Sequence, residues 1–511
     1  MSSTPEYLDS HGGSPQPPGP RGGRRTALIA GGAVGLLAVV GVGAWAAWSF
    51  FSTGPQPAAA LPASTVGYVS IDLDPSGGQK IEALRTLRKF PEFRDQVGLD
   101  TDDDVRKWVF EEVQGSTPCG DLDYEEDVEP WLGDRMAVAA VDNGADQPEP
   151  VIVLQVSDEG AADRGLAALR DCSGEQLAWN IADGWALLGE TQDVADGVAA
   201  DAADASLADD GDFQHWTDEA GGDGIVTAYL SPEAGRLIAD QLDSLSSVGG
   251  LPQQYAGDCA APCLGYSAVG PAAAIPDAAD ALKDFGGLAA TVRFSDGSLE
   301  LEVAADAGGA EQALGGSDAG DDVLATLPDD TAAALGVGFA EGWLGHLVDA
   351  DTLQQLADAT GLDLPGDAEA LAGRSAALAV SGDIDLDSML DPTGESGLPV
   401  GLKVQGDTDR IAAVVDRIGE PLGVDTEGDT VVVGPDADYR EQLLANGGLG
   451  GTDAFRAAVP DAGDAGAVLF VNFDAGSWFD DVDELEPLAA LGASVRVDDS
   501  TSHLVLRVTT D

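Results

Sequence analysis

The sequence WLGDRMAVAAV at residues 131–141 has a diverged copy, LAGRSAALAV, at residues 371–380, and this recurrence indicates how the chain is organised. Each version places a Gly and an Arg just ahead of an apolar strand. The following blocks also agree: PVIVLQVSDEGAADRGLAAL at 150–169 corresponds to PVGLKVQGDTDRIAAVVDRI at 399–418. Both blocks have the pattern of a short apolar strand, a polar turn and a helix. Blocks that recur in the same order predict an internal repeat.

The repeat extends outward in both directions. TVGYVSIDL at 65–73 precedes the first copy as TAAALGVGF at 331–339 precedes the second, and WALLG at 185–189 corresponds to TVVVG at 430–434. Each copy ends in two alternating runs around a turn, which is the pattern of a β-hairpin. We predict the α+β class: two diverged copies of a mixed, largely antiparallel sheet with helices packed on one face, at residues 61–310 and 323–511 with a linker at 311–322.

The N-terminal region has the pattern of a membrane anchor. Residues 1–25 are rich in Gly, Pro and Ser, which predicts a disordered tail. Residues 26–51 carry no charge and would form about 39 Å of helix, enough to cross a hydrocarbon core of about 30 Å. Arg21, Arg24 and Arg25 precede this segment, so the positive-inside rule predicts a cytoplasmic tail, a single-pass transmembrane helix, a spacer at 52–60 and an extracytoplasmic remainder. The alternative is a cleaved export signal, which leads to the same compartment.

The charge balance limits the classes of partner. Lys and Arg total 24 against 91 Asp and Glu, a formal net charge of −67 in 511 residues. Such a chain repels nucleic acids at long range, so we expect no nucleic-acid partner. The acidity is interpreted as a solvated surface, with weak binding of cations or of a basic partner as the alternative.

The cysteines form an even set, and three pairings of four cysteines exist. In an oxidising compartment we expect structural disulfides, Cys119 with Cys172 and Cys259 with Cys263, over free or metal-bound thiols. The C-x3-C spacing of the second pair differs from redox and zinc motifs.

Known catalytic and metal-binding patterns do not occur in the sequence. The histidines are widely separated and form no H-E-x-x-H motif. The acidic runs at 121–129 and 383–391 lack the Gly and Glu that an EF-hand loop needs. We therefore expect no catalytic residue, cofactor or bound metal.

One basic segment contrasts with the acidic background. It contains Lys80, Arg85, Arg88, Lys89 and Arg94, and its apolar residues recur at helical spacing until Pro91. These cations either pair with carboxylates of the chain itself or form a docking surface for an envelope protein or an anionic polymer near the membrane.

The residues also carry a resemblance. Leu61-Pro62, DLDPSGGQK at 72–80, ALRTLRKFP at 83–91 and PWLGDRMAVA at 130–139, behind one membrane segment, resemble domain of unknown function 3352 (DUF3352). The resemblance implies a membrane-anchored envelope protein of high-GC Gram-positive bacteria, and it brings no established activity or site residue.

From these observations we expect a single-pass protein of the cell membrane whose acidic exterior domain is a non-enzymatic envelope binding or scaffolding module. Two alternatives stay open. One is an envelope hydrolase with a pair of carboxylates between the repeats, and the other is a carrier of an apolar ligand.

Overall fold

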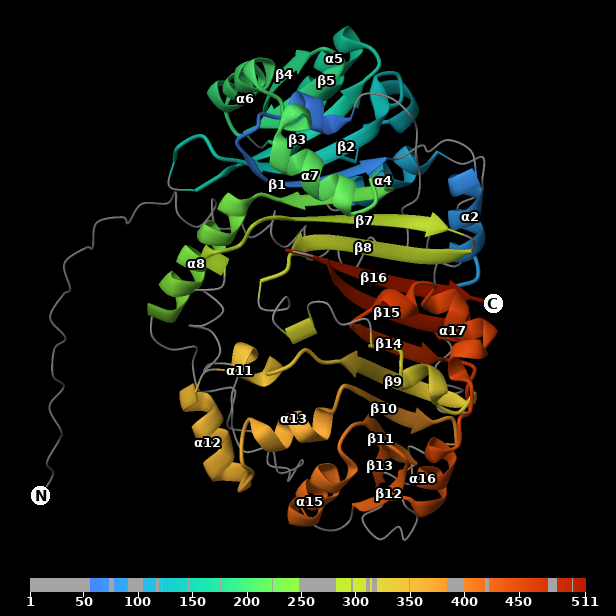
Figure 1. Ribbon diagram of the computed structural model, residues 1–511. Coiled ribbons are helices and arrows are strands. Elements are labelled where there is room, and N and C mark those ends of the chain that lie inside the picture. The colour runs from blue at the N-terminus through green and yellow to red at the C-terminus, as the bar shows by residue number, and fades with distance from the viewer. Residues whose placement is uncertain are drawn as a thin grey trace, which may run out of the picture. The chain divides into compact units, whose positions relative to one another are not determined.

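A computed structural model gives the fold of the protein (Figure 1). It describes residues 56–511 except 73–77, 91–103, 116–118, 121, 146, 175, 223, 248–281, 296, 309–312, 315–318, 349, 384–398, 419–421, 477–484 and 499. The predicted tail, the membrane helix and residues 52–55 of the spacer therefore lie outside the described residues, as do Arg94, Cys259 and Cys263. Within the described part of the chain, no helix combines the length and the apolar character needed to span a bilayer.

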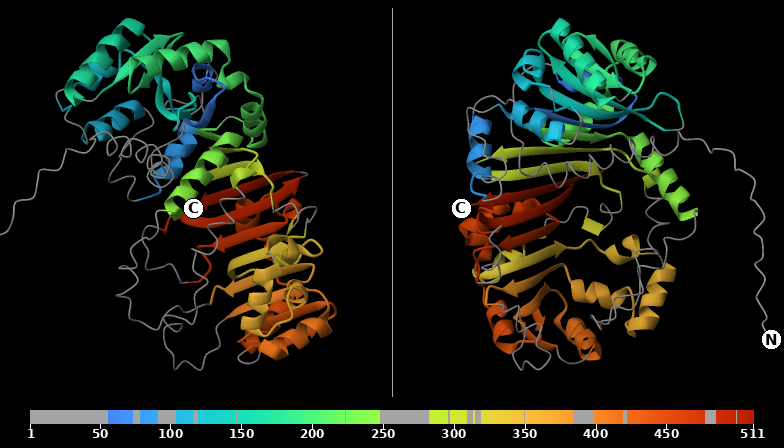
Figure 2. Two further views of the ribbon diagram at one scale, coloured as in Figure 1. Left: turned by 90° about the vertical axis from the view of Figure 1, so that its left-hand side faces the viewer. Right: turned by 180° about the vertical axis from the view of Figure 1, so that it is seen from behind.

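The strands form one sheet in which every recorded pair is antiparallel, as Figures 1 and 2 show. The mixed α+β class with a large antiparallel sheet is thus confirmed. The strands of residues 65–306 are β1 (Thr65–Asp72), β2 (Leu132–Val141), β3 (Glu149–Val156), β4 (Ala178–Ala182), β5 (Trp185–Gly189), β6 (Val226–Leu230), β7 (Leu288–Ser295) and β8 (Ser298–Asp306). Those of residues 331–510 are β9 (Thr331–Gly338), β10 (Ser375–Ser381), β11 (Val400–Gln405), β12 (Gly423–Glu427), β13 (Thr430–Gly434), β14 (Ala467–Asn472), β15 (Leu488–Asp498) and β16 (Thr501–Thr510).

The strand order repeats. The sheet runs β12-β13-β11-β10-β9-β14-β15-β16 and continues β8-β7-β6-β1-β2-β3-β5-β4. Read inward from each edge, the two halves have the same order, with β1 corresponding to β9 and β8 to β16. The two halves meet where β8 pairs with β16, with Leu301 opposite Leu506. Backbone hydrogen bonds therefore continue across the junction.

Helices connect the strands in each half. Those of the first half are η2 (Pro57–Ala60), α2 (Gly78–Leu87), α4 (Val105–Gly115), the π-helix η3 (Tyr124–Val128), α5 (Glu159–Ser173), α6 (Gln192–Asp204), η4 (Leu207–Asp209), α7 (Gly211–Glu219) and α8 (Pro232–Ser247). Those of the second are η7 (Leu324–Thr326), α11 (Trp343–Leu347), α12 (Ala350–Thr360), α13 (Gly366–Ala372), α15 (Thr408–Ile418), α16 (Ala437–Leu444), η8 (Leu449–Gly451), α17 (Asp453–Ala458) and η9 (Ala462–Asp464).

The prediction that helices cover one face of the sheet is wrong, because both faces carry buried cores. On β5, Leu187 packs in one core, whereas its neighbours Ala186 and Leu188 pack in another on the opposite face. On β13, Val432 likewise packs in one core and its neighbour Val431 in another core on the opposite face. Successive residues of a strand point to opposite faces, so an uninterrupted apolar run is the signature of a strand buried on both sides.

Candidate functional site

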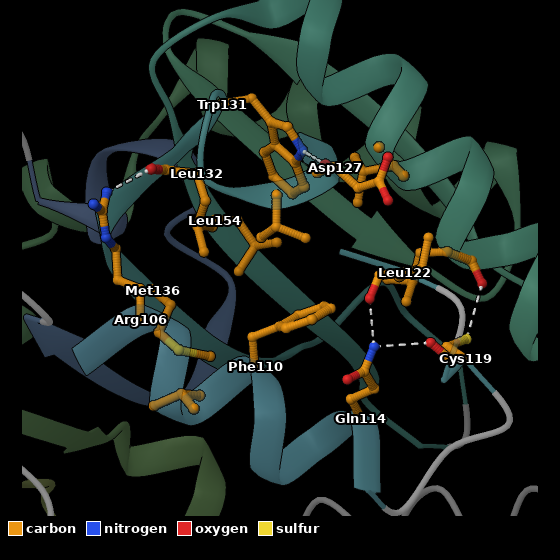
Figure 3. Close-up of a pocket in the computed structure, with 15 residues that line it drawn as sticks. Arg106, Phe110, Gln114, Cys119, Leu122, Asp127, Trp131, Leu132, Met136 and Leu154 are labelled. Carbon is orange, nitrogen blue, oxygen red and sulfur yellow. Dashed lines mark hydrogen bonds between the residues drawn. The ribbon is translucent and has the colours of Figure 1, made fainter. Parts of the chain in front are cut away.

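A cavity of about 200 Å³ lies on one face of β2 and β3. The side chains of Met136 and Leu154, which are cross-strand partners, form its floor. Helix α4 contributes Phe110 to one wall, and α5 contributes Leu166 and Leu169 to the facing wall. Most lining residues are apolar, and Figure 3 shows the ring of Phe110 directed into the space between the walls.

The α4 end of the pocket is held by a polar cluster. Asp104 precedes the helix and its carboxylate accepts hydrogen bonds from Arg106 Nε at 2.9 Å and from Tyr124 Oη at 2.7 Å. Arg106 Nη1 donates to the carbonyl of Leu132 at 2.8 Å, which ties α4 to the start of β2. Burial by itself raises the pKa of Asp104, but the hydrogen bonds from Arg106 and Tyr124 lower it below its ordinary value overall. The Asp104 carboxylate therefore stays ionised and keeps the helix in place.

The opposite end is closed by a covalent link. Cys119 and Cys172 form a disulfide that joins the loop after α4 to the last turn of α5, so the predicted pairing of these two residues is present. Gln114 Nε2 donates to the carbonyl oxygens of Cys119 at 3.0 Å and Leu122 at 2.7 Å. Together these contacts fix the distance between the two walls.

A close packing contact completes the site. Trp131 is buried, and its Nε1 donates to the carbonyl of Asp127 at 2.7 Å. The indole fits because residue 165 of α5 is Gly: a Cβ there would lie 2.3 Å from Trp131 Nε1. The side chains of Arg106, Gln114 and Trp131 thus direct their donors to protein acceptors around the pocket (Figure 3). Apolar contact is what remains for a bound molecule.

The predicted basic segment is elsewhere. Lys80, Arg85 and the buried Leu87 belong to α2, which packs against β7. Arg85 is exposed, whereas Lys89 Nζ donates to Thr510 Oγ1 at 2.9 Å, and Arg88 also has a partner. The structure brings none of these residues to the pocket, and their role as a docking surface stays a prediction.

Sequence reasoning missed the pocket apart from Cys119. Its walls come from α4 and α5, whose apolar residues recur at helical spacing. This spacing predicts helices, but it does not predict that the two helices face each other across β2 and β3. Among the described residues, no group of three or more His, Cys, Asp or Glu is placed to hold a metal ion.

Fold and site together define a duplicated α+β protein with an apolar pocket in its first half. A family model described as "Protein of unknown function (DUF3352)" matches residues 29–180, which supports the predicted resemblance. The pocket-lining residues, which span positions 106–169, all fall inside the matched region.

Other comparisons add little. No curated protein matches the chain. Crystal form I of TP0453 is 8% identical with a TM-score of 0.22, covering 77% of this chain and 98% of that one. Crystal form III is 7% identical with a TM-score of 0.15, covering 77% and 99%. Likeness at these scores carries no argument about fold or function.

Proposed function

We propose that this chain is a non-enzymatic, membrane-anchored binding module of the cell envelope whose pocket takes up an apolar molecule. The observation that carries the proposal is the pocket itself, which is lined by apolar side chains and whose neighbouring donors already have protein acceptors. A polar ligand would find few hydrogen-bond partners there and would lose its hydration on entry.

The volume narrows the class of ligand. A dry apolar cavity of about 150 Å³ in another protein binds benzene, whereas pockets for drug-sized molecules measure about 300 to 1,000 Å³. At about 200 Å³ this pocket suits a small apolar molecule or one end of a longer hydrocarbon chain. Because a disulfide ties the loop after α4 to α5 and the hydrogen bond from Arg106 to the Leu132 carbonyl ties α4 to β2, the cavity is preformed, which lowers the entropic cost of binding.

The hydrolase alternative receives less support from this site. Glycoside hydrolysis needs two carboxyl groups about 5 to 10 Å apart. Asp127 is the one acidic residue among those that line the pocket, and its Oδ2 accepts a hydrogen bond from the backbone of Asp123. The pocket is therefore built for binding.

The anchor and the compartment belong to the same proposal. The uncharged stretch at 26–51, the arginines before it and the presence of a disulfide all favour a single-pass protein with a cytoplasmic N-terminus and an extracytoplasmic domain. Protease treatment of intact spheroplasts should remove an epitope placed at the C-terminus. An epitope that survives until the membrane is lysed would refute this orientation.

Photolabelling tests the pocket. Cells that express the full-length protein would be treated with phenyl trifluoromethyl diazirine, a small neutral aromatic that forms a carbene in light, and labelled peptides would be mapped by mass spectrometry. We expect label on the peptides that contain Phe110 and Leu169. Leu122→Trp, which adds an indole to the cavity, should reduce this label about tenfold.

Ile238→Trp is the matched control, since Ile238 is 42% exposed on α8 and lies outside the pocket. It should leave pocket labelling unchanged. If label on the α4 and α5 peptides is no stronger than on the rest of the chain, or if Leu122→Trp does not reduce it, the pocket does not bind apolar molecules and the proposal fails.

A further inference from the structure

A second apolar surface lies on the sheet, outside the pocket. Leu378, Leu335 and Leu469 are 46%, 44% and 37% exposed, which is unusual for leucines in the middle of a sheet. They are direct cross-strand neighbours, with Leu335 of β9 opposite both Leu378 of β10 and Leu469 of β14. Their side chains therefore stand side by side on one face.

The pairing register extends this row. Across β10, β9, β14, β15, β16 and β8 the aligned residues are Leu378, Leu335, Leu469, Ala493, Leu506 and Leu301. Residues two positions before and after them share the same face. Those flanking rows, which begin at Ala376 and Val380 on β10, also hold only Ala, Val and Leu on all six strands, and within them Ala376 and Val508 are buried. We name this surface the leucine strip.

The size of the leucine strip argues against a second copy of the chain as its occupant. Strands about 4.8 Å apart make it about 24 Å long, and three rows make it about 14 Å wide, or about 300 Å². A stable protein interface buries about 800 Å² on each partner. The strip is therefore too small to hold two copies together, yet it is long enough for an extended hydrocarbon chain.

The same row leads toward the pocket. From Leu301 the register continues through Val292, Val226 and Ile71 to Met136 and Leu154, which form the pocket floor. The leucine strip and the pocket thus lie on the same face of one sheet, and the apolar neighbours between them are covered, since Ile71 is buried and Val226 packs against the core that contains Leu87 of α2.

We infer that the leucine strip binds the hydrocarbon chain of a lipid, an inference that rests on the proposed function and specifies its ligand class. The strip presents no charged or hydrogen-bonding side chain in its three rows, so it selects for a chain that offers none. Covering this apolar surface with hydrocarbon removes it from water, which favours binding of the chain. A net charge of −67 disfavours acidic headgroups, so the lipid we expect is neutral or zwitterionic.

A long-chain probe tests the inference. Cells that express the full-length protein would receive hexadecanol carrying a diazirine at mid-chain, and the crosslinked peptides would be mapped after illumination. We expect crosslinks on the peptides of β9, β10 and β14. Replacing Leu335, Leu378 and Leu469 together by Gln, a change of similar length at exposed positions, should reduce these crosslinks at least about tenfold, and Leu335→Gln alone should reduce them about threefold.

Ile418→Gln is the control, since Ile418 is 48% exposed on α15 and outside the strip. Melting curves of the purified variants would show that they remain folded, and the single variant serves if the triple one does not. Absence of strip crosslinks, or crosslinks that survive the triple substitution in folded protein, would overturn the inference. So would crosslinked dimers of the chain that disappear in the triple variant, because the strip would then be an interface between copies.

The two proposals fail separately. Leu122→Trp blocks the pocket but does not touch the strip, so strip crosslinks in that variant show the strip acting alone. If the small aromatic probe labels the pocket but the hexadecanol probe does not crosslink to the strip, the proposal for the pocket stands and the inference about the strip is overturned.

Discussion

Lys403 offers a sharp test of how the second half is packed. It lies on β11 between Ala377 and Val432, both fully buried, and its own side chain is 3% exposed. Within the described chain, the recorded hydrogen bond of Nζ is to the carbonyl of Thr326 at 3.3 Å. Burial lowers the pKa of the Lys403 ammonium below its ordinary value. An ammonium in such a place destabilises the fold unless it has a counter-ion.

The first half shows that the fold does not need a lysine here. Val153 holds the equivalent position on β3, opposite Leu187, two residues before the Gly that ends β5, and it is fully buried. Desolvation of a buried ion costs several kcal/mol, and a hydrogen bond to a charged group returns about 1.5 to 3 kcal/mol. We therefore expect Lys403→Met to raise the free energy of unfolding by about 1 to 3 kcal/mol at neutral pH.

The gain should depend on pH in a defined direction. Between the lowered pKa of Lys403 in the folded protein and 10.5 in the unfolded chain, the unfolded state binds more protons, so the stability of the unmodified protein rises with pH. Below this window the penalty of the buried charge is fully present. The advantage of Lys403→Met should therefore be largest at neutral pH and shrink as pH approaches 10.5.

Denaturant unfolding of the full-length protein at pH 7 and pH 10 measures both effects. Other groups titrate in both proteins, so the difference between them isolates Lys403. Lys107→Met is the control, because Lys107 is 41% exposed and pairs with Glu125 at the surface; it should change stability little, and equally at both pH values. A less stable Lys403→Met, or a difference that does not change with pH, would refute the reasoning.

Three further predictions concern the first half. Gly165→Ala should destabilise the protein by about 1 to 3 kcal/mol and reduce pocket photolabelling, because the added Cβ collides with the buried indole of Trp131. Gly197→Ala is the control, since Gly197 has open space around it in the middle of α6, and it should stabilise the protein by about 0.5 to 1 kcal/mol. The urea midpoints of the two variants measure these changes. Replacing Cys119 and Cys172 by Ser opens a link of sequence separation 53 and should cost about 4 kcal/mol, while reductant should leave the double variant unaffected; an unchanged melting temperature would contradict this. Arg135→Met removes the ion-pair partner of the buried Asp72 carboxylate and should cost about 3 to 5 kcal/mol in the same urea assay; a loss below about 1 kcal/mol would show that the 3.1 Å ion pair is not structural.

Local patterns in the sequence predicted the class of the fold, whereas the pairing of Cys119 with Cys172 was one of three possible pairings and is present in the structure. Alternating apolar runs, hairpin turns and strand-helix blocks are local patterns, and their recurrence from 131–141 to 371–380 needs no knowledge of contacts. The strand order then shows that equivalent blocks occupy equivalent places in the sheet. The fold class is predictable because neighbours along the chain set local conformation.

Only the tertiary structure decided which faces are buried and what they form. In VGLKVQ at 400–405, alternation indicates that Lys403 faces solvent, but its face of β11 is covered by the core that contains Ala377 and Val432. The pocket needs α4 and α5 to meet across β2 and β3, and the leucine strip needs the register of six strands from distant parts of the chain. These features depend on long-range strand pairing. A one-residue shift of register would move the side chains of a strand to the opposite face of the sheet, so the packing of the whole sheet determines the register.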